Sequence, residues 1–228
     1  MTGRFETLDV DGSSMPVYLA EGDGGGAGVL VCMHAPGVDA FIQDICHRLA
    51  DAGFTAAAPD LYHRQDAGDL NPLERMGLLR DTEILRDYEV AGDWLAGRSD
   101  PGRQGVIGFC MGGRLSYLWA AHRGGLRAAV VFYGGNILMP WGDAPAPFDR
   151  TGEIDCPLLG LFGNDDENPS PADVDRIAAE LDRAGKRYEF HRYDGAGHAF
   201  LNFMRPSLRE EAAADAWNRC ADFLRAHT

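Results

Sequence analysis

The sequence predicts an α/β fold in which a mostly parallel central sheet lies between helices on both faces. Short apolar runs alternate along the chain with segments of helical hydrophobic spacing. These runs are apolar at nearly every position, which is typical of strands buried on both faces of a sheet. The chain has 228 residues and contains no repeat and no long linker, so we expect a single domain over residues 1–228.

The elements are expected in a regular order. The first twenty residues alternate polar and apolar positions and predict an antiparallel strand pair at one edge. The glycine-rich residues 21–28 predict a loop; they precede a strand, whereas a dinucleotide-binding fingerprint follows one. Strands are expected at residues 29–33, 54–58, 105–109, 128–133, 157–162 and 187–193. Helices are expected at 41–52, 73–95 (a long, interrupted pattern), 111–122, 171–184 and 208–226.

The composition argues against several classes of partner. With 21 basic and 35 acidic residues the formal net charge is −14, which repels nucleic acid and anionic membrane surfaces. The most apolar run, residues 29–33, is too short to cross a bilayer. Five scattered cysteines without a CxxC pair indicate a reducing compartment, so we expect a cytoplasmic protein. No metal-binding or cofactor motif is present, and we expect neither a metal nor a cofactor.

Three loops that follow predicted strands carry reactive side chains. Residues 108–113 read Gly-Phe-Cys-Met-Gly-Gly, the G-x-C-x-G pattern of a nucleophile elbow with cysteine in place of serine. So sharp a turn requires glycine on both sides, and it exposes the Cys110 sulfur at a helix N-terminus, where partial positive charge favours thiolate. The Met111 N–H is then placed to bind an oxyanion. The alternative is a buried core cysteine beside a glycine packing motif.

The other two loops carry an acid and a histidine. In residues 162–169 we expect Asp165 to orient an imidazole, because the pattern G-x-D-x-x-x-P places it directly after the strand; Asp166 and Glu167 are expected to be solvated. In residues 193–200, small residues precede His198. An acidic loop and a lone loop histidine are each more often simple surface features. Cysteine, acid and histidine nevertheless occur in the chain order of the α/β-hydrolases.

These motifs resemble the dienelactone hydrolase family, the carboxymethylenebutenolidases and their relatives within the α/β-hydrolase fold. The resemblance extends from about residue 29 to the last helix. It rests on the cysteine elbow and on Pro-Asp-Leu-Tyr at 59–62, Phe-Tyr-Gly-Gly at 132–135 and Gly-His-Ala-Phe at 197–200. It implies that Cys110 is the nucleophile, His198 the base and Asp165 the acid.

The chain departs from this family at two places. Well-known members carry glutamate near the thiol after the strand that precedes the first main helix, where this chain has His34. The scheme that activates the thiol through that glutamate therefore does not transfer unchanged. The next residue, Ala35, still fits the second oxyanion donor. His34 either contacts the pocket or substrate, or braces the turn.

The second departure concerns the substrate. Family members hold the carboxylate of dienelactone with arginine, one of them four residues after the histidine, where this chain has Asn202. Arg205, Arg75 and Arg80 are the candidate replacements, and the net charge leaves open whether the substrate is anionic. Tyr133, at a strand end, and Trp141, in the long segment 134–152, are expected to form pocket walls together with His34, Asn202 and Arg80.

The expected function is hydrolysis of a carboxylic ester or lactone through a thioester acyl-enzyme. The alternatives are a general carboxylesterase or thioesterase, and a non-catalytic protein that binds a small ligand on the same fold. A small molecule is the only partner expected, and the protein is expected to be a monomer or a small homo-oligomer.

Overall fold

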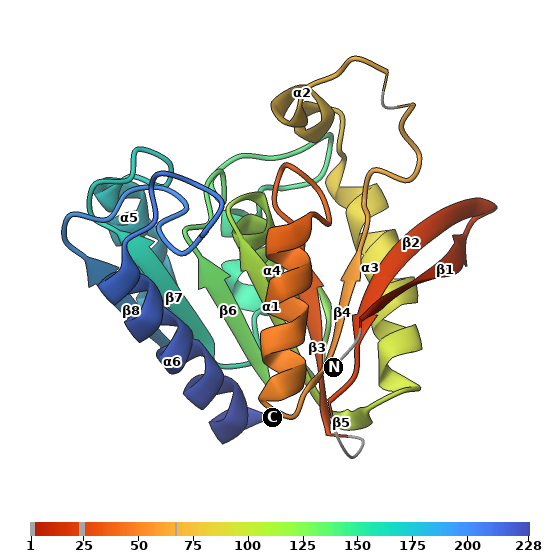
Figure 1. The fold of residues 1–228 in the computed structure, drawn as a ribbon. Coiled ribbons are helices and arrows are strands. Elements are labelled where there is room, and N and C mark those ends of the chain that lie inside the picture. The colour runs from red at the N-terminus through yellow and green to blue at the C-terminus, as the bar shows by residue number, and fades with distance from the viewer. Residues whose placement is uncertain (1–2, 23–25, 67) are drawn as a thin grey trace.

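The computed structural model describes residues 3–22, 26–66 and 68–228, and eight strands in them form one sheet (Figure 1). Its order is β1-β2-β4-β3-β5-β6-β7-β8. β1 pairs with β2, and β2 with β4, in antiparallel fashion, whereas all other neighbours are parallel. The strands are β1 (Arg4–Val10), β2 (Ser13–Ala20), β3 (Ala27–Cys32), β4 (Thr55–Pro59), β5 (Asp100–Phe109), β6 (Ala128–Phe132), β7 (Leu158–Gly163) and β8 (Tyr188–Tyr193).

Helices cover both faces of this sheet. α1 and α6 lie on the face toward the viewer in Figure 1, and α3, α4 and α5 lie on the other face. The helices are α1 (Ala40–Asp51), α2 (Pro72–Gly77), α3 (Asp81–Ala96), α4 (Met111–His122), α5 (Pro171–Arg183), α6 (Glu210–His227) and the 3₁₀ helix η1 (Pro147–Glu153). The predicted fold class is confirmed, including the antiparallel strand pair at the N-terminal edge.

The expected helix at 73–95 is two helices, α2 and α3, separated by residues 78–80. α2 has its own start signal, because the Asn71 side chain caps it and Glu74 completes a capping box. It buries no residue, so packing does not hold it in line with α3, which buries one face against the sheet. The glycine-rich loop expected at 21–28 falls partly on residues 23–25, which lie outside the described residues.

The fold places a crevice at the carboxyl ends of the strands. From β3 the chain passes through α1 to β4 on one side, and from β5 it passes through α4 to β6 on the other. At such a reversal of strand order the two loops diverge, and ligands bind between them. Figure 1 shows α2 and the loops after β7 and β8 gathered at this end of the sheet. Within the described ranges, no helix combines the length and apolarity needed to cross a membrane.

Candidate active site

Cys110 lies at a tight turn between β5 and α4. Its backbone has φ 57° and ψ −118°, a strained conformation for a residue with a side chain. The turn requires the flanking glycines, because a Cβ on Gly108 would lie 1.8 Å from the Gly112 carbonyl oxygen. A Cβ on Gly112 would lie 2.1 Å from the Cys32 carbonyl oxygen. The predicted nucleophile elbow is therefore present, and Cys110 lines a pocket of about 810 Å³.

Two residues that line the pocket of Cys110, Met111 and Ala35, are those expected to bind an oxyanion through their backbone amides. Met111 is the first residue of α4, so its N–H has no acceptor within the helix. Ala35 lies in a turn in which Gly37 N–H donates to the His34 carbonyl oxygen at 2.9 Å. Because C=O and N–H point in opposite directions across a trans peptide, the Ala35 N–H points out of that turn. Both residues line the pocket that contains Cys110.

The carboxylate that contacts His198 belongs to Asp166, and the expectation of Asp165 is wrong in this respect. Asp166 Oδ2 lies 2.9 Å from His198 Nδ1, and its residue is only 4% exposed. Its second oxygen accepts a hydrogen bond from the Asn168 N–H at 2.9 Å. Asp165 occupies the turn directly after β7, where its N–H donates to the Ala196 carbonyl oxygen and its side chain is exposed. Asp166 is thus the buried acid, and the solvation expected for it does not occur.

His198 lies between this buried carboxylate and Cys110. Burial lowers the pKa of the imidazole, but hydrogen bonds to Asp166 and Cys110 and the negative charge of both outweigh burial and raise the pKa to about 10. Nδ1 contacts Asp166, and the imidazole lines the same pocket as Cys110. A raised pKa favours the protonated imidazole, and an imidazolium beside a cysteine can stabilise a thiolate and supply a proton.

His34 and Asn202 also line the pocket, as expected. His34 Nε2 lies 2.8 Å from Asp39 Oδ1, although the approach does not meet hydrogen-bond geometry. The same oxygen accepts hydrogen bonds from the Phe41 and Ile42 amides at the start of α1. Burial raises the pKa of Asp39, but His34 and these amides outweigh it, and the net shift is downward. His34 is thus tied to the helix cap and borders the pocket at once.

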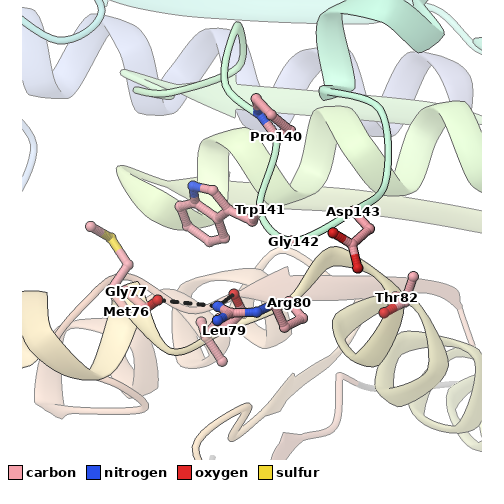
Figure 2. A pocket seen from close by; sticks show the side chains of 9 residues that line it. All are labelled: Met76, Gly77, Leu79, Arg80, Thr82, Pro140, Trp141, Gly142 and Asp143. Atoms are coloured by element: carbon pink, nitrogen blue, oxygen red, sulfur yellow. Dashed lines mark hydrogen bonds between the residues drawn. The ribbon is translucent and has the colours of Figure 1, made fainter.

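Arg80 and Trp141 do not line this pocket, and their predicted place in its wall is wrong. They line a neighbouring cavity of about 600 Å³ between α2, the start of α3 and residues 140–143 (Figure 2). Arg80 Nη1 donates to the Gly77 and Leu79 carbonyl oxygens at 3.2 and 3.0 Å, which keeps it on that side.

Trp141 braces the chain instead. The Arg114 guanidinium lies 4.0 Å from the centre of the Trp141 ring, and the Trp141 backbone N–H donates to Asp81 Oδ2 at 3.1 Å. Arg114 and Asp81 form a fully buried ion pair at 2.6 Å. These contacts fix residue 141 to α3 and α4, and Trp141 lines the neighbouring cavity in place of the pocket of Cys110.

Of the three candidate arginines, only Arg205 lines the pocket. Its backbone N–H donates to the Asn202 carbonyl oxygen at 3.0 Å, and its exposed guanidinium forms no ion pair with any described residue. Arg75 instead stacks on the Tyr62 ring at 4.1 Å and bonds Gln65. The sequence offered no signal that separates Arg205 from Arg75, and the G-x-D-x-x-x-P pattern favoured Asp165 over Asp166 wrongly, because these choices depend on loop conformation.

The central sheet, the elbow and the buried acid–histidine pair define an α/β-hydrolase. The chain matches the model of the dienelactone hydrolase family over residues 15–228. It belongs to that family, and it is a hydrolase of the ester or lactone type.

Individual relatives agree with this assignment. The chain is 36% identical over 228 residues to a protein of Methylorubrum extorquens named "Putative carboxymethylenebutenolidase", covering 92% of this chain and 76% of the relative. It is 31% identical to a Bradyrhizobium protein named "Probable 2-oxo-3-(5-oxofuran-2-ylidene)propanoate lactonase", covering 96% and 92%. A crystal structure named "Putative Dienelactone Hydrolase" from Klebsiella pneumoniae superposes with a TM-score of 0.91 at 32% identity, covering 99% of each chain.

Proposed function

We propose that this chain hydrolyses carboxylic esters or lactones with Cys110 as nucleophile, His198 as acid and base, and Asp166 as the residue that orients His198. The observation that carries the proposal is the contact of His198 Nδ1 with the buried Asp166 carboxylate while the same imidazole interacts with Cys110. A ligand-binding protein needs no such arrangement, whereas acyl transfer requires a nucleophile, a proton carrier and a group that orients it.

Acylation begins from the thiolate and the imidazolium. The Cys110 sulfur attacks the carbonyl carbon, and the Met111 and Ala35 amides bind the oxyanion. The intermediate collapses as the bond from carbon to the leaving oxygen breaks, and His198 gives its proton to that oxygen. The products are a thioester on Cys110, neutral His198 and the alcohol or enol, which stays attached to the acyl group if the substrate is a lactone.

Deacylation uses water in place of the alcohol. Neutral His198 takes a proton from water as the water oxygen attacks the thioester carbon, and the carbon–sulfur bond then breaks. Cys110 thiolate and His198 imidazolium are regenerated and a carboxylic acid is released. A thiolate is itself a good leaving group from the first intermediate, so productive acylation favours substrates whose leaving oxygen is also good, such as enol lactones and activated esters.

The pocket supports a substrate that carries a carboxylate. Arg205 brings an unpaired guanidinium to the pocket, and a guanidinium binds a carboxylate through two parallel hydrogen bonds. Asp165, Asp166 and Glu167 also line the pocket, so the anion is expected on the Arg205 side and away from that loop. The Bradyrhizobium relative is named for a propanoate lactone, which agrees with an anionic substrate.

A hydrolysis panel tests the proposal. Wild type and Cys110→Ala are compared on p-nitrophenyl acetate, a thioester, a neutral enol lactone and a carboxylate-bearing enol lactone. We expect turnover in wild type, highest kcat/KM for the anionic lactone, and no turnover by a Cys110→Ala variant with an unchanged circular dichroism spectrum. Equal rates on all four substrates would instead identify a general carboxylesterase or thioesterase. Activity that persists in Cys110→Ala would contradict the mechanism.

A further inference from the structure

Tyr133 is held in an unusual position at the end of β6. Its φ is 37°, in the left-handed region that a tyrosine rarely adopts, and its N–H donates to the Leu161 carbonyl oxygen at 2.9 Å. The ring is 1% exposed and packs edge-on against His198 and Phe200, with ring centroids 5.4 and 5.3 Å away. Such backbone strain persists where the surrounding structure over-determines it, and it concentrates at functional sites.

The Tyr133 hydroxyl has no hydrogen-bond partner among the described residues, although it is buried and its residue lines the pocket of Cys110. Two other buried tyrosines are paired: Tyr62 donates to the Ala35 carbonyl oxygen at 2.7 Å, and Tyr117 bonds Thr151 at 2.6 Å. An unpaired buried hydroxyl costs roughly 1–3 kcal/mol. Because Tyr133 lines the pocket, a substrate bound there can supply the missing partner.

This hydroxyl remains a donor over the working pH range. Burial raises the pKa of Tyr133 well above its usual range, and the negative charges of Cys110 and Asp166 raise it further.

The position of Tyr133 selects its role. The oxyanion donors come from the loop after β3 and the start of α4, on one side of the nucleophile. Tyr133 comes from β6 and His198 from the loop after β8, both on the other side. The oxygen that leaves the carbonyl carbon must reach His198, because His198 protonates it. That oxygen therefore departs on the side where Tyr133 lies.

We propose that Tyr133 is a catalytic residue whose hydroxyl donates a hydrogen bond to the departing ester or lactone oxygen, beside His198. The inference rests on the proposed function of Cys110 and His198. As the bond from carbon to oxygen breaks, its electron pair stays on the oxygen, which takes the proton of His198. Tyr133 keeps its own proton and stabilises the charge that develops before that transfer is complete.

The dependence on the leaving group distinguishes this role from a structural one. A p-nitrophenolate leaves readily without a donor, whereas a phenolate or an alkoxide carries more negative charge on oxygen and needs one. Loss of a hydrogen bond to a developing charge lowers the rate by about 10- to 100-fold. This loss is no larger than the loss of rate when an oxyanion-hole donor is removed. Tyr133→Phe should therefore impair poor leaving groups by that factor and nitrophenyl esters by much less.

The test measures kcat/KM, which reports acylation, for a series of aryl and alkyl acetates in wild type, Tyr133→Phe and a control, Tyr88→Phe. Tyr88 lies in α3 and is equally buried, but its hydroxyl lies beside the buried Cys32 thiol and it does not line the pocket. Tyr133→Phe removes a hydroxyl that has no partner, so its melting temperature should not fall. We expect log kcat/KM to decline more steeply with leaving-group pKa in Tyr133→Phe and with the wild-type slope in Tyr88→Phe.

An unchanged slope in Tyr133→Phe, with rates either equal to wild type or lowered uniformly for all esters, would overturn this inference and leave the proposed function standing. A steeper slope in Tyr88→Phe as well would also overturn it. Absence of any Cys110-dependent turnover in wild type would contradict the proposed function and this inference together.

Discussion

Replacing Asp166 by Asn removes the buried charge that lies 2.9 Å from His198 Nδ1. The hydrogen bond and charge of Asp166 help to hold the pKa of His198 at about 10, so the variant should lower that pKa and weaken the thiolate–imidazolium pair. A hydrogen bond to a charged group contributes roughly 1.5–3 kcal/mol, and Asp166 is too buried for water to replace it. The expected loss in kcat/KM is thus about 10- to 150-fold.

Asp165→Asn is the matched control, because it makes the same chemical change one residue earlier in the same loop, at an exposed side chain. The assay is hydrolysis of a p-nitrophenyl ester across pH, together with alkylation of Cys110 by iodoacetamide as a measure of thiolate. Asp166→Asn should lower both rates and move the alkaline limit of activity to lower pH, whereas Asp165→Asn should resemble wild type within about twofold. Equal losses in both variants, or full activity in Asp166→Asn, would refute the assignment of Asp166.

Three further predictions follow from the elbow, the pocket and the imidazole. Gly108→Ala should destabilise the fold by several kcal/mol in urea unfolding, because its Cβ would lie 1.8 Å from the Gly112 carbonyl oxygen. Gly102→Ala, whose Cβ would have its nearest contact at 3.4 Å, should change the free energy of unfolding little. Comparable losses of stability in the two variants would contradict the steric explanation. Arg205→Gln should raise KM about 10-fold or more for a carboxylate-bearing lactone but not for a neutral ester. Arg80→Gln should leave the KM of both the lactone and the ester unchanged. An equal effect of Arg205→Gln and Arg80→Gln would show that Arg205 does not bind the carboxylate. The pKa of His198 is raised from 6.5 to about 10, so its stabilising contribution is complete below pH 6.5 and is lost as pH rises through 10. The difference in melting temperature between wild type and His198→Gln should therefore shrink between pH 6 and pH 10, and a difference that grows would contradict the raised pKa.

The sequence allowed prediction of features that depend on local pattern. Apolar runs placed the parallel strands, and the G-x-C-x-G motif placed Cys110 in a turn whose glycines prove sterically required. Some residues were assigned to the wrong position because their place depends on the conformation of a loop. The pattern of residues along the sequence does not encode that conformation. Neighbouring aspartates in one loop differ in burial, since Asp165 is exposed whereas Asp166 is buried in contact with His198.

The same limit applies to the pocket wall. Trp141 is an aromatic residue in a long segment, and its contacts with the buried pair of Arg114 and Asp81 accompany its place in the neighbouring cavity. Arg205 differs from Arg80 through tertiary contacts, since backbone carbonyl oxygens hold Arg80 in the neighbouring cavity. Composition likewise left the charge of the substrate open, because screening limits the reach of a distant net charge of −14 to about 8 Å, and the charged side chains that line the pocket act at shorter range.

Covalent capture of the acyl-enzyme tests the central claim most directly. Wild-type protein is mixed with excess p-nitrophenyl acetate, quenched with acid within the first turnovers and digested for peptide mass spectrometry, with Cys110→Ala treated in parallel. The mechanism predicts one acetyl group on the peptide that contains Cys110, removable by hydroxylamine as expected of a thioester, and no such adduct in Cys110→Ala. Turnover accompanied by acetylation of a different residue, or by an adduct of equal yield in Cys110→Ala, would contradict it.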